Sequence, residues 1–258
     1  MANSLSIHRY WFWAALSAAT IALVGCANRP PAPQLSDQAL PAQYVGNLPC
    51  ADCGGIVYRL TLGHGRRYVL RQHYKTTQPT PDIFETGRWT VDDGQRLTLT
   101  PADTDYAAQS VWRIDNDGAL LTALDDQGRA LDASTDYQLS NQTAPADLAL
   151  TGVRWQLANA PEESIAASAY IQFDADASQL AGSTGCNRLT AAYHRNAQEL
   201  SITRLATTRR DCPGRMDTEQ SLTTALRQTT QFTVLGHYLL LFGTASEPAP
   251  LAIFHAAD

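Results

Sequence analysis

The residues with the most specific chemistry in this 258-residue chain are its five cysteines, Cys26, Cys50, Cys53, Cys186 and Cys212. Cys50 and Cys53 are separated by two residues, in a C-A-D-C string. Two thiolates at this spacing can bind a soft ion such as Cu(I), carry out thiol–disulfide exchange, or form a structural disulfide in an oxidising compartment. The pair therefore leaves three possibilities open: a copper site, a thiol oxidoreductase, and a disulfide that fixes a loop.

The residues around Cys50 and Cys53 argue against an oxidoreductase. In such enzymes the motif lies at a helix N-terminus, which lowers the pKa of the attacking thiol. Here two glycines and a strand-like run beginning at Ile56 follow the motif, so no helix dipole is available. The carboxylate of Asp52, between the two thiols, would also raise their pKa values. We therefore expect that the protein is not an enzyme.

Copper binding at Cys50 and Cys53 would need further ligands. No Met or His lies close to them in sequence, although His64 and His73 could approach in the folded chain. The histidines as a group show no H-x-H or H-E-x-x-H spacing. The sequence also contains no phosphate-binding loop, dinucleotide fingerprint or G-x-S-x-G string. We expect no cofactor, with Cu(I) held by these two cysteines as the alternative.

The N-terminal residues indicate export and lipid attachment. An apolar run from Trp11 to Val24 carries no charge and is followed closely by Cys26. It is shorter than the roughly 20 residues that span a bilayer, and it is typical of a signal peptide. The L-V-G-C string at its end resembles the lipobox of bacterial lipoproteins, which implies cleavage after residue 25 and anchoring in the membrane through acyl chains on Cys26. Ala27, where Asp would favour inner-membrane retention, implies an outer-membrane location, facing the periplasm or the cell surface.

Composition and pattern predict a mainly β protein with two domains. A net charge of −6 and a pI near 5.4 exclude the basic surface of a nucleic-acid-binding protein. Short alternating runs separated by turn signals predict a small antiparallel barrel or sandwich in the first half. We expect a signal peptide over 1–25, a Pro-rich tether over 26–42, a first domain over 43–140, a linker over 141–150 and a second domain over 151–258.

The second domain is predicted to be α+β, with one helix on a β-sheet. Six strand-like runs follow Trp155, and a helical pattern beginning near Met216 interrupts them. Asp217 is the expected N-cap, because Gln220 three residues later completes a pair that resembles a capping box. The positions expected on one face of the helix are Leu222, Ala225, Leu226 and Thr229.

Two stretches resemble known families. Residues 44–56, with the string Y-V-G-N-L-P-C-A-D-C-G-G-I, and the F-E-T-G-R-W string at 84–89 resemble the NlpE N-terminal domain, also called a copper-resistance or copper-homeostasis domain. That resemblance implies a small, lipocalin-like β-barrel. The G-S-T-G-C-N-R string at 182–188 and the L-A-T-T-R-R-D-C string at 205–212 are similar to the META domain of HslJ heat-shock lipoproteins, for which the resemblance implies a fold and a compartment more than an activity.

The four cysteines other than Cys26 allow three disulfide pairings. The family resemblance and the domain boundary both favour Cys50–Cys53 and Cys186–Cys212. The resemblance to NlpE also implies a role in envelope-stress sensing or signalling with a protein partner, or in copper homeostasis. The alternative is a periplasmic binding protein for Cu(I) or for a small apolar ligand inside the barrel.

Overall fold

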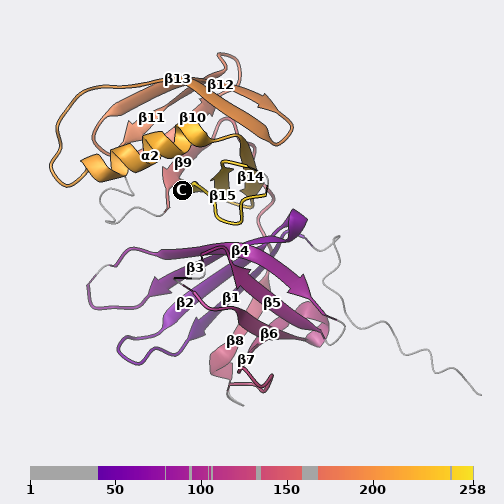
Figure 1. The fold of residues 1–258 in the computed structure, drawn as a ribbon. Helices are drawn as coiled ribbons and strands as arrows, with labels where there is room; N and C mark the ends of the chain where they lie inside the picture. The colour runs from indigo at the N-terminus through magenta and orange to yellow at the C-terminus, as the bar shows by residue number, and fades with distance from the viewer. Residues whose placement is uncertain are drawn as a thin grey trace, which may run out of the picture. The chain divides into compact units, whose positions relative to one another are not determined.

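The structure, a computed structural model, describes residues 40–78, 80–92, 95–103, 105, 107–131, 135–158, 168–244 and 246–257. Within these residues, sixteen strands form two closed antiparallel barrels of eight strands each (Figure 1). The expected signal peptide and Cys26 lie outside the described residues. No helix in the described part of the chain is both long enough and apolar enough to cross a bilayer.

The first barrel is an up-and-down meander in which every strand pairs with its neighbours in sequence. Strand β1 closes the barrel on β8, through pairs such as Tyr44 with Asn141. The strands are β1 Ala42–Leu48, β2 Ile56–Leu62, β3 Arg67–Tyr74, β4 Ile83–Val91, β5 Arg96–Pro101, β6 Ser110–Asp115, β7 Leu120–Leu124 and β8 Gln138–Gln142. Short 3-10 turns at His64–Arg66, Asn116–Gly118 and Thr135–Tyr137 lie in the connections.

Alternation along these strands fills the first barrel with apolar side chains. The inward positions of β4 include Trp89, which is fully buried and donates its indole N–H to the carbonyls of Gly63 and Arg67. Gly87 lies two residues earlier, and a Cβ there would come 2.1 Å from the carbonyl oxygen of Thr100. The other fully buried members of this core are Tyr44, Leu60, Leu62, Tyr68, Leu97, Leu99, Leu121 and Leu139.

The second half also closes, into a barrel and not an open sheet. Strand β9 pairs with both β10 and β16, so the chain again runs as a sequential meander. The strands are β9 Arg154–Leu157, β10 Ala169–Asp174, β11 Gln179–Thr184, β12 Arg188–Asn196, β13 Glu199–Thr207, β14 Gln231–Leu235, β15 Tyr238–Phe242 and β16 Ala252–Ala256. The mainly β prediction is confirmed, and so is the helix of the second domain, α2, among the described residues.

Helix α2, Met216–Gln228, contacts β11, β13 and β15 and buries the predicted apolar face. Its Leu222, Ala225 and Leu226 belong to the same buried cluster as Trp155. The prediction that Asp217 caps the helix is wrong. The N-cap is Arg215, which makes no side-chain capping bond, and Asp217 lies inside the first turn. A carboxylate there still interacts favourably with the helix dipole.

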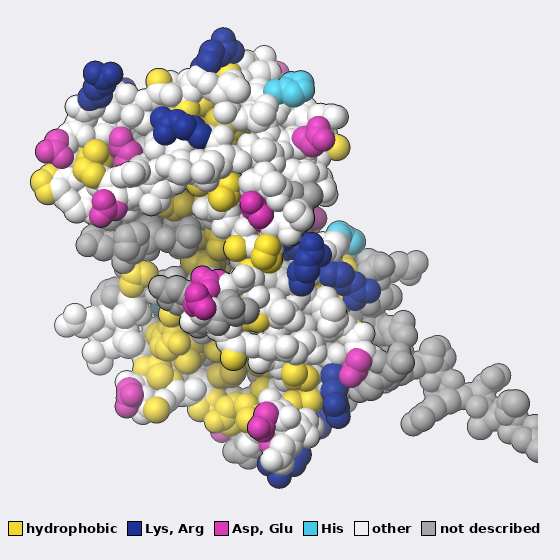
Figure 2. All heavy atoms as spheres, in the orientation of Figure 1, with side chains coloured by type: hydrophobic (Ala, Val, Ile, Leu, Met, Phe, Trp, Pro, Cys, Tyr) yellow, Lys and Arg dark blue, Asp and Glu magenta, His cyan; other side chains and the backbone are white. Residues whose placement is uncertain are grey.

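The viewed surface carries both signs of charge. Figure 2 shows acidic and basic side chains spread over both barrels, with hydrophobic side chains gathered over part of the first.

Candidate functional site

The Cys50–Cys53 pair lies in the loop between β1 and β2, at one end of the first barrel, and the two residues form a disulfide. Reciprocal backbone bonds join this loop to the residue that follows β3: Gly54 N–H donates to the Lys75 carbonyl, and Lys75 N–H donates to the Gly55 carbonyl, each at 2.9 Å. Gly55 has a φ of 119°, which favours glycine. These two backbone bonds therefore hold the β1–β2 loop against the end of β3.

The predicted metal site at Cys50 and Cys53 does not fit the residues present. Both sulfurs are used in the disulfide, so neither is a thiolate that could bind Cu(I). His64 lies in the β2–β3 turn at the other end of the barrel, and His73 contacts Asp82 with a nitrogen–oxygen distance of 2.8 Å. Among the described residues, no group of three or more His, Cys, Asp or Glu side chains could hold a metal ion. The strand that follows the motif also supplies no helix dipole for an attacking thiol.

A carboxylate inside the first barrel was missed from the sequence. Glu85, on β4, accepts a hydrogen bond of 2.6 Å from the hydroxyl of Tyr68, on β3. Burial raises the pKa of Glu85, and the bond from Tyr68 lowers it by less. Burial, with smaller contributions from Tyr74 and Glu85, raises the pKa of Tyr58 to about 12. These residues therefore form one interacting polar group on the inner surface of the barrel.

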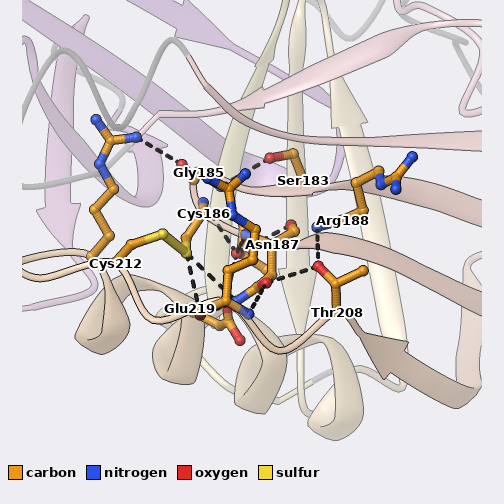
Figure 3. The surroundings of a disulfide bond; sticks show 11 residues. Ser183, Gly185, Cys186, Asn187, Arg188, Thr208, Cys212 and Glu219 are labelled. Atoms are coloured by element: carbon orange, nitrogen blue, oxygen red, sulfur yellow. Dashed lines mark hydrogen bonds between the residues drawn. A yellow bond between two sulfur atoms is a disulfide. The ribbon is translucent and has the colours of Figure 1, made fainter.

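The second cysteine pair joins the start of the helix to the sheet. Cys186 lies between β11 and β12, Cys212 lies four residues before α2, and the two form a disulfide (Figure 3). Arg215, the N-cap of α2, donates a hydrogen bond of 2.8 Å to the Gly185 carbonyl across the same junction. The disulfide and this bond therefore hold the helix entry against the β11–β12 turn.

Asn187, beside the disulfide, is only 1% exposed, and both the nitrogen and the oxygen of its side-chain amide form hydrogen bonds. Its amide nitrogen donates to the Arg210 carbonyl at 2.9 Å and to Glu219 Oε2 at 2.8 Å. Its amide oxygen accepts from Thr208 Oγ1 and from the Arg210 backbone N–H, both at 2.8 Å. Figure 3 shows Asn187 between Thr208 and Glu219. One buried side chain thus connects the β11–β12 turn, the segment after β13 and helix α2.

This arrangement is suited to stabilising the fold more than to catalysis. Thr184 Oγ1 also donates to Glu219 Oε2, at 2.7 Å, so that carboxylate oxygen already accepts two hydrogen bonds. The G-C-N-R string marked the segment, but nothing in it indicated that Asn187 would be the centre of a buried network. A single Asn has no periodicity, and its partners are more than 20 residues away.

Two family models match separate parts of the chain. The NlpE N-terminal domain matches residues 44–134, and the META domain matches residues 148–257. Lipoprotein NlpE of Escherichia coli (strain K12) is 29% identical over 136 residues, which are 50% of this chain and 54% of that protein. The chain thus spans about half the length of this curated relative.

Two solved structures are also similar. A crystal structure from Shewanella oneidensis, of a protein assigned as a lipoprotein, is 27% identical with a TM-score of 0.34, covering 42% of this chain and 95% of that chain. The crystal structure of the Cpx pathway activator NlpE from Escherichia coli is 19% identical with a TM-score of 0.31, covering 68% of this chain and 100% of that chain. By the two family matches, the chain contains an NlpE-like domain followed by a META domain.

Proposed function

We propose that the protein is a lipoprotein of the bacterial envelope that acts in stress signalling without catalysing a reaction. The observation that carries this proposal is the 136-residue match to lipoprotein NlpE, together with the NlpE domain match over residues 44–134. A structure of NlpE is described as that of the Cpx pathway activator. The proposed partner is therefore a protein of an envelope signalling pathway.

The proposed organisation follows the sequence. Residues 1–25 are removed as a signal peptide, and lipid on Cys26 anchors the chain in the outer membrane. Residues 26–42 are a tether, and the two domains occupy 43–140 and 151–258, joined by the linker 141–150. The Pro-rich tether supports this arrangement because such segments are extended, at roughly 3 Å per residue, and keep a folded domain away from the bilayer.

The Cu(I) alternative is less well supported. Copper binding at Cys50 and Cys53 would require reduction of their disulfide and ligands from elsewhere. An apolar ligand deep in the first barrel would have to displace packed side chains, since Tyr44, Trp89 and Leu97 are fully buried there. The Cys50–Cys53 disulfide is better explained as a brace for the β1–β2 loop.

Lipid attachment predicts a specific processing defect. Replacing Cys26 by alanine removes the thiol that would receive the lipid, so we expect no incorporation of labelled fatty acid and accumulation of unprocessed precursor. Metabolic labelling and gel mobility measure both effects. Cys50→Ala is the matched control and should be labelled normally. If Cys26→Ala matures into a soluble periplasmic form, the lipoprotein assignment is wrong.

The signalling role predicts activation of a Cpx reporter. Expression of the full chain in an Escherichia coli strain that lacks its own NlpE should raise a Cpx-dependent transcriptional reporter above the empty-vector level. Joint replacement of Cys50 and Cys53 by serine should leave this induction in place, whereas a Cu(I)-dependent function would be lost. An unchanged reporter, with the protein present in the envelope fraction, would contradict the proposal.

A further inference from the structure

The inner surface of the first barrel becomes more polar at the end that carries the Cys50–Cys53 loop. Cross-strand pairs place Tyr58 opposite Gln72 and Leu70 opposite Glu85, while Leu60 faces Leu70. Leu60 and Leu70 are core residues, and paired residues share a face of a sheet. Tyr58, Gln72 and Glu85 therefore point into the barrel, and so does Tyr74, two residues after Gln72.

Several inward-facing side chains at this end of the barrel are partly exposed. Along β2, Leu60 and Leu62 are fully buried, but Ile56 and Tyr58 are partly exposed. Along β3, Tyr68 is fully buried, whereas Gln72 and Tyr74 are partly exposed. Glu85 is also partly exposed. We call this partly exposed end of the barrel interior the mouth; Tyr68, which is bonded to Glu85, lies deeper.

The loops around this mouth are acidic. In an up-and-down barrel, the β1–β2, β3–β4, β5–β6 and β7–β8 connections all lie at the same end. Their described residues include two basic residues, Lys75 and Arg129, and seven aspartates: Asp52, Asp82, Asp103, Asp105, Asp125, Asp126 and Asp136. Asp82 is paired with Arg71 and Asp125 with Arg129, and the other five aspartates outnumber Lys75. A concentration of one sign around a concave site raises the local concentration of the opposite charge. The mouth therefore favours a cation.

Apolar side chains complete the rim. Ile83, at the start of β4, is 50% exposed, and Leu131, in the β7–β8 connection, is 51% exposed. They are two of the three exposed large hydrophobic side chains in the described part of the chain. A ligand suited to this mouth thus combines a positive charge with apolar groups.

We propose that Glu85, with Tyr58 and Tyr74 beside it, forms a binding site for a small organic ammonium ion at the mouth of the first barrel, while the buried Tyr68 holds the carboxylate in place. Aromatic rings attract weakly hydrated organic cations, and the carboxylate supplies the opposite charge. Strongly hydrated metal ions prefer several oxygen ligands, and the described residues offer no such group here. The ammonium group can belong to a free compound or to a phospholipid headgroup. This site is independent of the proposed signalling role.

Glu85 gives the site a measurable signature. Because burial raises its pKa, the ionised carboxylate destabilises the fold, and this penalty is absent below the pKa that the group has in the unfolded chain and grows as pH rises through the higher folded value. Glu85→Gln removes the charge and keeps an acceptor for Tyr68. The variant should therefore melt at a higher temperature than the natural protein near pH 7, and this advantage should diminish as the pH is lowered.

Calorimetric titration of the purified full chain with choline tests the site. We expect saturable binding in the millimolar range or tighter. The neutral isostere 3,3-dimethylbutan-1-ol should bind about tenfold more weakly or not at all, because it lacks the charge. Glu85→Gln should weaken choline binding by about tenfold or more. Tyr74→Leu should also weaken it, while Tyr74→Phe, which keeps the ring, should retain most of the affinity.

Glu199→Gln is the matched control, since Glu199 is exposed on β13 of the second barrel. It should leave choline binding unchanged. Ethanolamine tests a primary ammonium in place of a quaternary one. Co-sedimentation with phosphatidylcholine vesicles, compared with phosphatidylglycerol vesicles, tests a lipid headgroup: binding only to free choline assigns a soluble ligand, and selective binding to phosphatidylcholine assigns the headgroup.

Three results would overturn the proposal. The first is no saturable binding of choline or ethanolamine by the folded protein. The second is equal binding of choline and its neutral isostere. The third is an equal loss of affinity in Glu85→Gln and Glu199→Gln. Because the Cpx reporter assay uses no added ligand, failure of the proposed function leaves these outcomes unaffected.

Discussion

Joint replacement of Cys186 and Cys212 by serine should lower the free energy of unfolding of the second barrel by about 3.5 kcal/mol. The disulfide joins residues separated by 26 positions, and the chain-entropy model assigns about this value to a loop of that length. The loss is a large fraction of the 5–15 kcal/mol that stabilises a typical domain. Chemical denaturation, followed by hydrogen exchange of peptides from each barrel, measures the effect.

The Cys50–Cys53 pair is the matched comparison. Its cysteines are separated by only three positions, and the same model then gives about half the stabilisation. Replacing both by serine should therefore destabilise less, with the loss of protection in peptides of the first barrel. Equal losses from the two double variants, or loss of protection in the first barrel when Cys186 and Cys212 are replaced, would show that the Cys186–Cys212 bond is not a local brace.

Asn187→Ala should cost the second barrel about 3 kcal/mol. The substitution removes the hydrogen bonds of the Asn187 amide to Arg210, Thr208, Glu219 and Cys186 Sγ, although Glu219 Oε2 still accepts one from Thr184. Each buried polar group that loses its partner costs about 1–3 kcal/mol, and access of water to the vacated space offsets part of the sum. Urea unfolding of the oxidised protein measures the change.

Two further variants separate this network from a general effect of losing an Asn. Asn196, which is exposed at the end of β12, should tolerate alanine with a change of no more than about 0.5 kcal/mol. Asn187→Asp keeps an acceptor but can place a second carboxylate against Glu219, so it should be more destabilising at neutral pH than in mild acid. A stable Asn187→Ala protein would mean that Cys186–Cys212 holds the junction without the network.

Local patterns were sufficient for the class of fold. The alternating runs and turn signals predicted the strands, and the spacing of Leu222, Ala225 and Leu226 predicted the helix face that is buried. Closure of the second sheet was not predicted, because alternation shows which face of a strand is buried but not which strand lies beside β9. The wrong N-cap at Asp217 has a similar cause, since the start of α2 is fixed by contacts such as Arg215 with Gly185.

The candidate sites, like the fold, could be predicted from the sequence only in part. The cysteine spacing and the family resemblance were enough to anticipate both cysteine pairs, but neither Glu85 nor Asn187 could be recognised from sequence. An acidic residue in a half-exposed strand usually faces solvent. Only the register of β3 with β4 shows that Glu85 shares the inner surface with Tyr68. Prediction of such a residue requires the register of the whole barrel.

The sequential order of both barrels has a consequence for how the chain folds. Each hairpin forms between neighbouring strands, but β1 closes on β8, about 100 residues later, and β9 closes on β16 across a similar span. Until the last strand of each barrel is available, the first strand therefore has an unpaired hydrogen-bonding edge. Such edges favour aggregation. Because strands β1–β8 precede strands β9–β16 in the chain, the first barrel can close before the second has emerged, and few strand edges are unpaired at any one time.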